Sequence, residues 1–155
     1  MKLTREQITE QVQELLAAIL GQCRLEMDVE AGIAADAVQI HLKGPDSEHF
    51  LADNARLLYA LNHLLNQIFF RRSMDRVNVI LDCEGYRSAR DFELRLLARK
   101  AAEKVRVSGA KVVLQPMPSS ERRIIHLTLS EERGVRTQSE GTGRFRKVLI
   151  LPESS

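Results

Sequence analysis

Tryptophan is absent from the 155-residue sequence, and cysteine, proline and the aromatic residues are scarce. The two cysteines, Cys23 and Cys83, are lone residues far apart in the chain, a separation that does not suggest a pair of metal ligands. We expect two small core thiols in a reduced, cytoplasmic setting. No apolar run approaches the roughly 18 residues that a membrane-spanning helix needs, and no signal-peptide pattern follows Met1. The sequence therefore predicts a cytoplasmic protein without a membrane segment.

Patterns for catalysis and for cofactors are also missing. There is no P-loop and no Gly-x-Gly-x-x-Gly, so a nucleotide cofactor has no phosphate cradle. Asp82 and Glu84 could hold a cation at a strand end, but a surface pair is the simpler interpretation. Ser139 could pair with a histidine base, yet no strained elbow raises the serine. Without a His-x-x-x-His pair or a nearby cysteine, we also expect no metal site at the four histidines, which are His41, His49, His63 and His126. The sequence predicts neither an enzyme nor a cofactor.

The composition is that of a soluble globular protein, with 44% hydrophobic and 28% charged residues. The length suits one ordinary domain or two very small ones. Residues 1–55 contain four Lys/Arg against ten Asp/Glu, whereas residues 56–155 contain nineteen against eleven. A polyanion should therefore approach the second part of the chain.

Residues 4–20 show the periodicity of an amphipathic helix, with Thr4 as N-cap and Gly21 as the stop. Its apolar positions are Ile8, Val12, Leu15, Leu16, Ile19 and Leu20. Two alternating strands follow across an Ala-Gly-rich turn. Their apolar positions are Leu25, Met27 and Val29 in the first and Val38, Ile40 and Leu42 in the second.

Gly44-Pro45-Asp46 ends the second strand, and Asp46 can cap a short helix that runs through Leu51. A long helix is predicted from Ala55 to about Arg71. Its expected buried side consists of Leu57, Leu58, Leu61, Leu64, Leu65 and Ile68. A third strand then carries Val77, Val79 and Leu81. The order helix, strand, strand, helix, helix, strand over residues 1–84 resembles a type II KH domain.

A KH domain binds nucleic acid through a Gly-x-x-Gly loop whose bare backbone lets phosphates approach. The corresponding residues here are Ala52, Asp53, Asn54 and Ala55. A methyl group at each end of the loop should obstruct that approach, and the carboxylate should repel phosphate. The resemblance thus implies a KH-like fold with a degenerate loop, impaired for RNA and better suited to a scaffold or a protein-docking role.

A second long helix is predicted from the Glu84-Gly85-Tyr86-Arg87 junction to about Val107. Its apolar stripe consists of Leu94, Leu97, Ala98, Ala101 and Val105. A short strand at 111–115 follows. A third helix should have Pro118 as its first residue, Ser119 or Ser120 as a source of capping oxygens, and Gly134 as its stop. Its apolar positions are Ile124, Ile125, Leu127 and Leu129.

A hairpin is predicted from Val135–Ser139 and Arg144–Leu151, joined by residues 140–143. Val148 and Ile150 should pack under the helix. Arg122 and His126 are four apart on that helix, so they share one face. A guanidinium can fork onto phosphate oxygens, an imidazole can bind phosphate or stack on a base, and loop amides bind anions. The candidate nucleic-acid-binding residues are Arg122, Arg123, His126, Arg136, Ser139, Gly141, Gly143, Arg144, Arg146 and Lys147.

The strings ERRIIH, GV-x-T-x-SEG and R-x-VLI-x-P together resemble the Arg-xxx-His domain, in the version found in the Jag (KhpB, SpoIIIJ-associated) family of bacterial RNA-binding proteins. There this module follows a KH domain. The resemblance implies an α+β protein with a KH-like domain at 1–84 (α-β-β-α-α-β) and an Arg-xxx-His single-stranded nucleic-acid-binding domain at 86–152 (α-β-α-β-β). Its expected ligand is single-stranded RNA, with single-stranded DNA as the alternative.

Two functions remain open. The first is a non-catalytic RNA-binding protein whose C-terminal domain grips phosphates. The second is an adaptor whose KH-like half docks on a protein, either a KH-domain partner or a second copy, with nucleic acid secondary or absent. His126 is likewise open between a nucleotide clamp and a partly buried residue that holds the hairpin to the helix. Only Tyr59, Tyr86 and Phe145 are candidates for base stacking, which predicts weak base selectivity.

Overall fold

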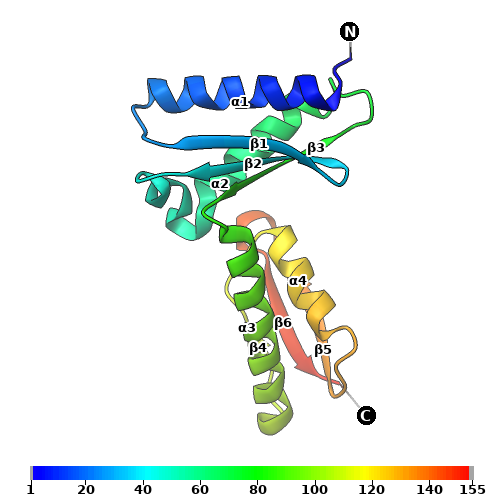
Figure 1. The fold of residues 1–155 in the computed structure, drawn as a ribbon. Coiled ribbons are helices and arrows are strands. Elements are labelled where there is room, and N and C mark those ends of the chain that lie inside the picture. The colour runs from blue at the N-terminus through cyan, green and yellow to red at the C-terminus, as the bar shows by residue number, and fades with distance from the viewer. Residues whose placement is uncertain (1, 154–155) are drawn as a thin grey trace. The chain divides into compact units, whose positions relative to one another are not determined.

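The computed structural model describes residues 2–153 as an α+β protein with two three-stranded sheets (Figure 1). The chain divides into two compact units, Met1–Arg87 and Ser88–Ser155. The order of helices and strands predicted from the sequence is confirmed, except that the two central helices of the first unit count as one helix with an internal break.

Helix α1 (Arg5–Gln22) begins as the sequence predicts. The Thr4 hydroxyl accepts a hydrogen bond from the Gln7 amide at 3.3 Å, and the Gln7 side chain accepts one from the Thr4 amide at 3.0 Å, which completes a capping box. The helix runs one residue past Gly21, so that glycine is not the stop. The buried side of α1 consists of Ile8, Val12, Leu16 and Leu20.

The first sheet has the order β1-β2-β3. Strand β1 (Asp28–Ala34) pairs antiparallel with β2 (Ala37–Lys43), and β2 pairs parallel with β3 (Asn78–Cys83). Parallel neighbours need a long crossover, which helix α2 (Ser47–Phe69) supplies. One face of this sheet packs against the buried sides of both helices. The strand residues of that core are Val38, Ile40, Leu42, Val79 and Leu81.

Helix α2 departs from the sequence prediction on its outer side. Leu58 and Leu65 are buried, but Leu57 is 45% exposed and Leu64 is 50% exposed. Both exposed leucines lie one position before a buried one, which places them on the flank of the helix and away from the sheet. Asp46 stands at the N-cap position without capping, because its carboxylate accepts the Glu26 amide at 2.6 Å instead.

The two cysteines differ in environment. Cys83 ends β3 and is buried, whereas Cys23 follows α1 and is exposed, so the prediction of two core thiols is wrong for Cys23. Burial raises the pKa of the Cys83 thiol to about 11, and the neighbouring carboxylates of Glu84 and Asp82 act in the same direction.

The second sheet has the order β4-β6-β5, and both pairings are antiparallel. Helix α3 runs from Tyr86 to Ser108, and it is followed by β4 (Val112–Val113), α4 (Ser119–Leu129), β5 (Val135–Glu140), a 3-10 turn η1 (Gly143–Phe145) and β6 (Lys147–Pro152). The predicted packing of Val148 and Ile150 under α4 is confirmed, since both are fully buried in the core that contains Ile125 and Leu129. Helix α3 adds Leu94, Ala98, Ala101, Ala102 and Val105 to this core.

Several boundaries in the second unit differ from the prediction. Helix α4 ends at Leu129, and Gly134, with φ +80°, instead supplies the left-handed residue just before β5. Pro118 precedes the helix, and no side chain caps it. Strand β6 starts at Lys147, so the connection from β5 is longer than predicted. Strand β4 has only two residues.

Two residues assigned to apolar stripes in this unit are exposed. Leu97 on α3 is 42% exposed and Leu127 on α4 is 59% exposed. Glu121, which the stripe of α4 did not include, is buried in their place, with 1% exposure.

Candidate nucleic-acid interface

Helix α4 is fixed at its first turn by a buried ion pair. The Glu121 carboxylate accepts hydrogen bonds from the Arg90 guanidinium of α3 at 3.3 Å and 3.1 Å. Arg90 also reaches Glu93 at 3.2 Å. Apolar contacts of Ile125 and Leu129 hold the remainder of the helix. The helix face next to this anchored side is therefore held in a defined orientation.

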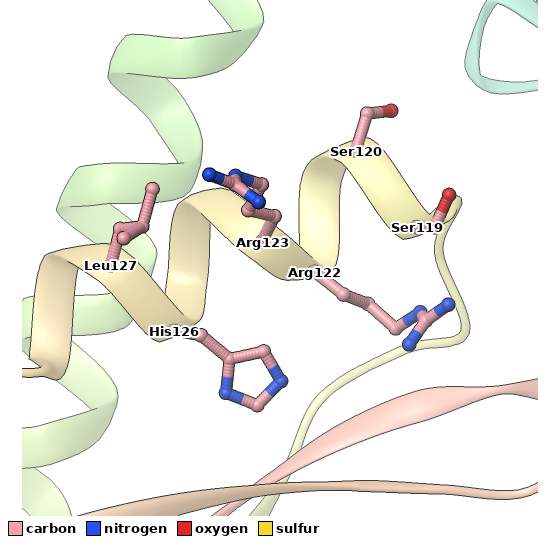
Figure 2. Close-up of a pocket in the computed structure, with 6 residues that line it drawn as sticks. All are labelled: Ser119, Ser120, Arg122, Arg123, His126 and Leu127. Carbon is pink, nitrogen blue, oxygen red and sulfur yellow. The ribbon is translucent and has the colours of Figure 1, made fainter.

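That face carries Arg122 and His126, both directed toward the strands in Figure 2. The His126 ring bonds the hairpin through both nitrogens: Nδ1 lies 2.6 Å from the Thr137 hydroxyl oxygen, and Nε2 lies 2.9 Å from the Ser139 hydroxyl oxygen. The Arg122 Nη1 donates to the same Ser139 oxygen at 3.2 Å, and its Nε donates to the Met117 carbonyl at 3.3 Å. Arg122, His126 and Ser139 therefore form one hydrogen-bonded cluster.

The electrostatics of this cluster favour a neutral imidazole. Partial burial lowers the pKa of His126, and the positive charge of Arg122 lowers it further. In the neutral ring one nitrogen donates and the other accepts, and hydroxyl groups can satisfy either role. At neutral pH, His126 is thus a bridge between α4 and β5, and the positive charge of the cluster is that of Arg122.

An open groove of about 650 Å³ lies along the same helix (Figure 2). Figure 2 shows Arg123 and Leu127 leaving α4 on the side away from the strands, so the two predicted arginines do not share a face. The residues that line the groove are Ser119, Ser120, Arg122, Arg123, His126 and Leu127.

The hairpin divides the other predicted residues between two faces. Along β5 the partly buried Thr137 and Ser139 point to α4, whereas Arg136 is exposed and points to the opposite face. Lys147 pairs across the hairpin with Glu140, and these two side chains also lie on that opposite face, with their charged groups 3.8 Å apart. Arg136 and Lys147 are therefore not brought to Arg122 and His126.

The connection between β5 and β6 contains the remaining predicted residues, and all six residues at 141–146 are exposed. Gly141 has φ +91°, and a Cβ there would lie 3.0 Å from the Phe145 carbonyl oxygen, so this turn requires glycine. Gly143 has φ +52° with open space around it. The Arg144 guanidinium lies 4.9 Å from the centre of the Phe145 ring. Within residues 2–153, Ser139 is the hairpin residue of the predicted set that hydrogen-bonds to Arg122 and His126.

Sequence reasoning missed Thr137 and the Arg90–Glu121 pair. Thr137 could have been found by strand alternation, since it lies two residues before Ser139 and therefore on the same face. The ion pair gave no local signal, because its members are 31 positions apart.

The degenerate loop in α2 has an unusual backbone. Asp53, Asn54 and Ala55 all have positive φ values, between +51° and +56°. Ala52 is exposed, but Ala55 is fully buried, so the prediction that both methyl groups face an approaching phosphate is wrong for Ala55. The carboxylate of Asp53 lies 3.4 Å from Arg56, which offsets part of its charge at the surface.

Two of the three candidate stacking residues belong to the first unit and are not free for a base. The rings of Tyr59 and Tyr86 pack edge to face, with centres 6.5 Å apart, and Arg87 lies 5.5 Å from the centre of the Tyr59 ring. Both tyrosines are partly buried against the core, which leaves Phe145, at 65% exposure.

Over the described residues, no cluster of three or more potential metal ligands is present. In residues 2–153, helices with enough length and hydropathy to cross a membrane are likewise absent.

Comparison with known proteins gives matches to both the C-terminal region and nearly the whole chain. The family model of the Arg-xxx-His domain matches residues 93–152. The chain is 32% identical over 148 residues to the RNA-binding protein KhpB of Clostridium symbiosum, covering 94% of this chain and 67% of that protein. It is 33% identical over 141 residues to the RNA-binding protein KhpB of Bacillus subtilis (90% and 66%) and 28% identical over 137 residues to that of Lactiplantibacillus plantarum (88% and 42%). The chain thus spans from under half to about two thirds of these relatives.

Proposed function

The chain belongs to the KhpB (Jag) family, and on that premise we propose that it is a non-catalytic cytoplasmic protein that binds single-stranded RNA through the unit Ser88–Ser155. That unit contains fourteen Lys/Arg against eight Asp/Glu, whereas the unit Met1–Arg87 contains nine against thirteen. The second unit therefore has a charge of +6 and the first −4, with histidines neutral, which directs a polyanion to the second unit.

The observation that carries the proposal is the state of Arg122. Within residues 2–153, this guanidinium forms no ion pair with a carboxylate; it is held by a carbonyl and a hydroxyl oxygen. Arg90, Arg95 and Arg106 in the same unit are each paired with an acid. A positioned guanidinium whose charge is not neutralised is suited to a phosphate, which it can bind through two parallel hydrogen bonds.

His126 supports this site as a positioning residue. By bonding Thr137 and Ser139 together, the ring fixes the hydroxyl that accepts from Arg122. Its lowered pKa means that its charge contributes little at neutral pH. Arg123 lies along the same groove, and Arg144 and Arg146 in the exposed loop are further candidates for phosphate contacts.

The test is a titration of the full chain with a labelled single-stranded RNA, with a duplex as comparison, at two salt concentrations. Phosphate-led binding should lie in the range of about 10⁻⁴ to 10⁻⁶ M near physiological salt and weaken as salt rises. Arg122→Ala and Arg122→Lys should both lose affinity, since lysine lacks the planar fork. Arg95→Ala is the matched control, because Arg95 is paired with Asp91 at 2.8 Å. If Arg122→Ala bound RNA as tightly as the parent, the proposal would be wrong.

We propose that the two units are the KH-like domain (1–84) and the Arg-xxx-His domain (86–152), and that the KH-like loop is impaired. The loop keeps a left-handed backbone, yet it has a methyl at Ala52 and a carboxylate at Asp53 on its exposed side. Replacing Ala52 and Ala55 with glycine and Asp53 with lysine should raise RNA affinity. No gain in a folded triple variant would mean that the rest of this unit also lacks an RNA surface.

A second candidate function has a specific observation in its favour. Leu57 and Leu64 are one helical repeat apart on the outer side of α2, and both are about half exposed. This arrangement suits an adaptor whose KH-like unit docks on a KH-domain protein or on a second copy of the chain. Sedimentation of the parent and of a Leu57→Glu/Leu64→Glu variant at several concentrations tests the second copy; self-association that the variant loses would favour the adaptor.

A further inference from the structure

We infer that Phe145 and Arg144 form a stacking site for one unpaired nucleobase. The inference rests on the proposed RNA binding and names a contact that phosphate binding does not require. The Arg144 guanidinium lies over the Phe145 ring, 4.9 Å from its centre, and the residue nevertheless keeps 65% of its surface exposed. Because Arg144 covers one face, the exposed surface comprises the remaining face and the ring edge.

The loop holds this ring in place. The Phe145 amide donates to the Thr142 carbonyl at 3.1 Å, and the Arg146 amide donates to the Gly143 carbonyl at 3.3 Å, which closes the 3-10 turn. On the far side, the Arg146 carbonyl accepts the Met117 amide at 3.2 Å. Gly141 lets the backbone pass within contact distance of Phe145. An exposed aromatic ring is thus presented on a turn fixed at both ends.

The surroundings select a base over an apolar protein surface. Phe145 is the single apolar side chain of the sequence Gly-Thr-Gly-Arg-Phe-Arg at 141–146. An apolar partner would need a wider patch, whereas a nucleotide offers one π-face and one phosphate. The flanking arginines, Arg144 and Arg146, are exposed and, within residues 2–153, form no ion pair, so both can reach a phosphate next to the stacked base.

The site also explains a preference for single strands. A base in a duplex has both faces covered by its neighbours, whereas an unpaired base has a face free for an aromatic ring. The loop follows Ser139 by one residue along the hairpin, so the Arg122 cluster and the stacking site belong to the same structural element. One strand can therefore contact a guanidinium at the first and place a base at the second.

The absence of tryptophan from the chain allows a direct test. Phe145→Trp in the full chain creates a single indole at the site. Its emission should be quenched when oligouridine binds, and the anisotropy of a dye on the oligonucleotide reports binding independently. Phe92→Trp is the matched control, since Phe92 is 70% exposed on α3 in the same unit; its emission should stay unchanged. An abasic oligonucleotide of equal length should bind without quenching.

Affinity gives the second measurement. Phe145→Ala should weaken oligouridine binding by roughly 5- to 150-fold, the range of one base–aromatic stack, and Phe145→Leu should lose nearly as much because it lacks a π-face. Binding of the abasic oligonucleotide should not change in either variant. Binding without quenching, equal quenching at the Phe92 position, or an unaltered affinity of Phe145→Ala would overturn the stacking site while leaving RNA binding intact. An absence of any anisotropy change would overturn both proposals.

Discussion

Replacing His126 with alanine is expected to loosen the hairpin before it removes an RNA contact. The ring makes two hydrogen bonds, to Thr137 at 2.6 Å and to Ser139 at 2.9 Å. A neutral intramolecular hydrogen bond contributes about 1 kcal/mol net. Both hydroxyls belong to partly exposed residues, so water can satisfy them in the variant and no full burial penalty arises. His126→Ala should therefore lower the free energy of unfolding by roughly 1–3 kcal/mol.

Urea denaturation followed by circular dichroism measures this loss, and two single variants apportion it. Thr137→Val removes the partner of Nδ1, and Ser139→Ala removes the partner of Nε2 together with the Arg122 contact. In a double-mutant cycle, His126 and Ser139 should be coupled by at least about 0.5 kcal/mol, as contacting residues generally are.

The pH dependence follows from the lowered pKa. Because the folded state holds the His126 pKa below the ordinary 6.5, the unfolded chain binds the proton more readily. The free energy of unfolding should then fall as the pH drops through 6.5 and on toward the folded pKa. The alanine variant lacks this term, so the stability gap between parent and variant should be widest above pH 7 and narrower at pH 5.5. A variant as stable as the parent at both pH values, with RNA affinity lost per folded molecule, would refute the bridging role and restore a direct clamp.

Three further predictions concern other parts of the molecule. Arg90→Ala should cost about 3–5 kcal/mol because it leaves the buried Glu121 carboxylate without its guanidinium, whereas a double Met/Leu replacement of the pair should be near neutral in the same urea assay. Ala55→Gly should be about 1 kcal/mol more stable than Ala52→Gly, because only Ala55 has a left-handed backbone that glycine relieves; equal stabilities would argue against that backbone. At pH 8, a thiol reagent should modify Cys23 while the second thiol, buried and with a pKa of about 11, stays unmodified until the protein unfolds.

The sequence was sufficient for the order of the elements, because each has a strong local pattern. Thr4 and Gln7 form the predicted start of α1, and the alternation at Val148 and Ile150 identified the face of β6 that packs under α4. The errors come from positions where local rules permit two outcomes. Leu57 and Leu127 extend an apolar stripe in projection, yet the sheet covers only one side of each helix, and these flanks remain exposed.

The candidate site was predictable in its centre and not at its margins. The spacing of Arg122 and His126 places them on one face whatever the tertiary structure. The placement of Arg136 and Lys147 depends instead on strand register, and a shift of one residue reverses the face of every side chain. The register of β5 with β6, in which Ser139 lies opposite Val148, turns these two cations away from α4.

The buried pair Arg90–Glu121 also has a consequence for the evolution of the family. Losing either charge alone passes through a strongly destabilised protein, whereas losing both together does not. Substitutions at positions 90 and 121 should therefore be rare singly and should occur jointly among relatives, as an Arg–Glu pair, its reversal or two apolar residues. These positions are 31 residues apart, on different helices. Their joint variation would give a sequence-level marker of how α4, and with it Arg122, is oriented.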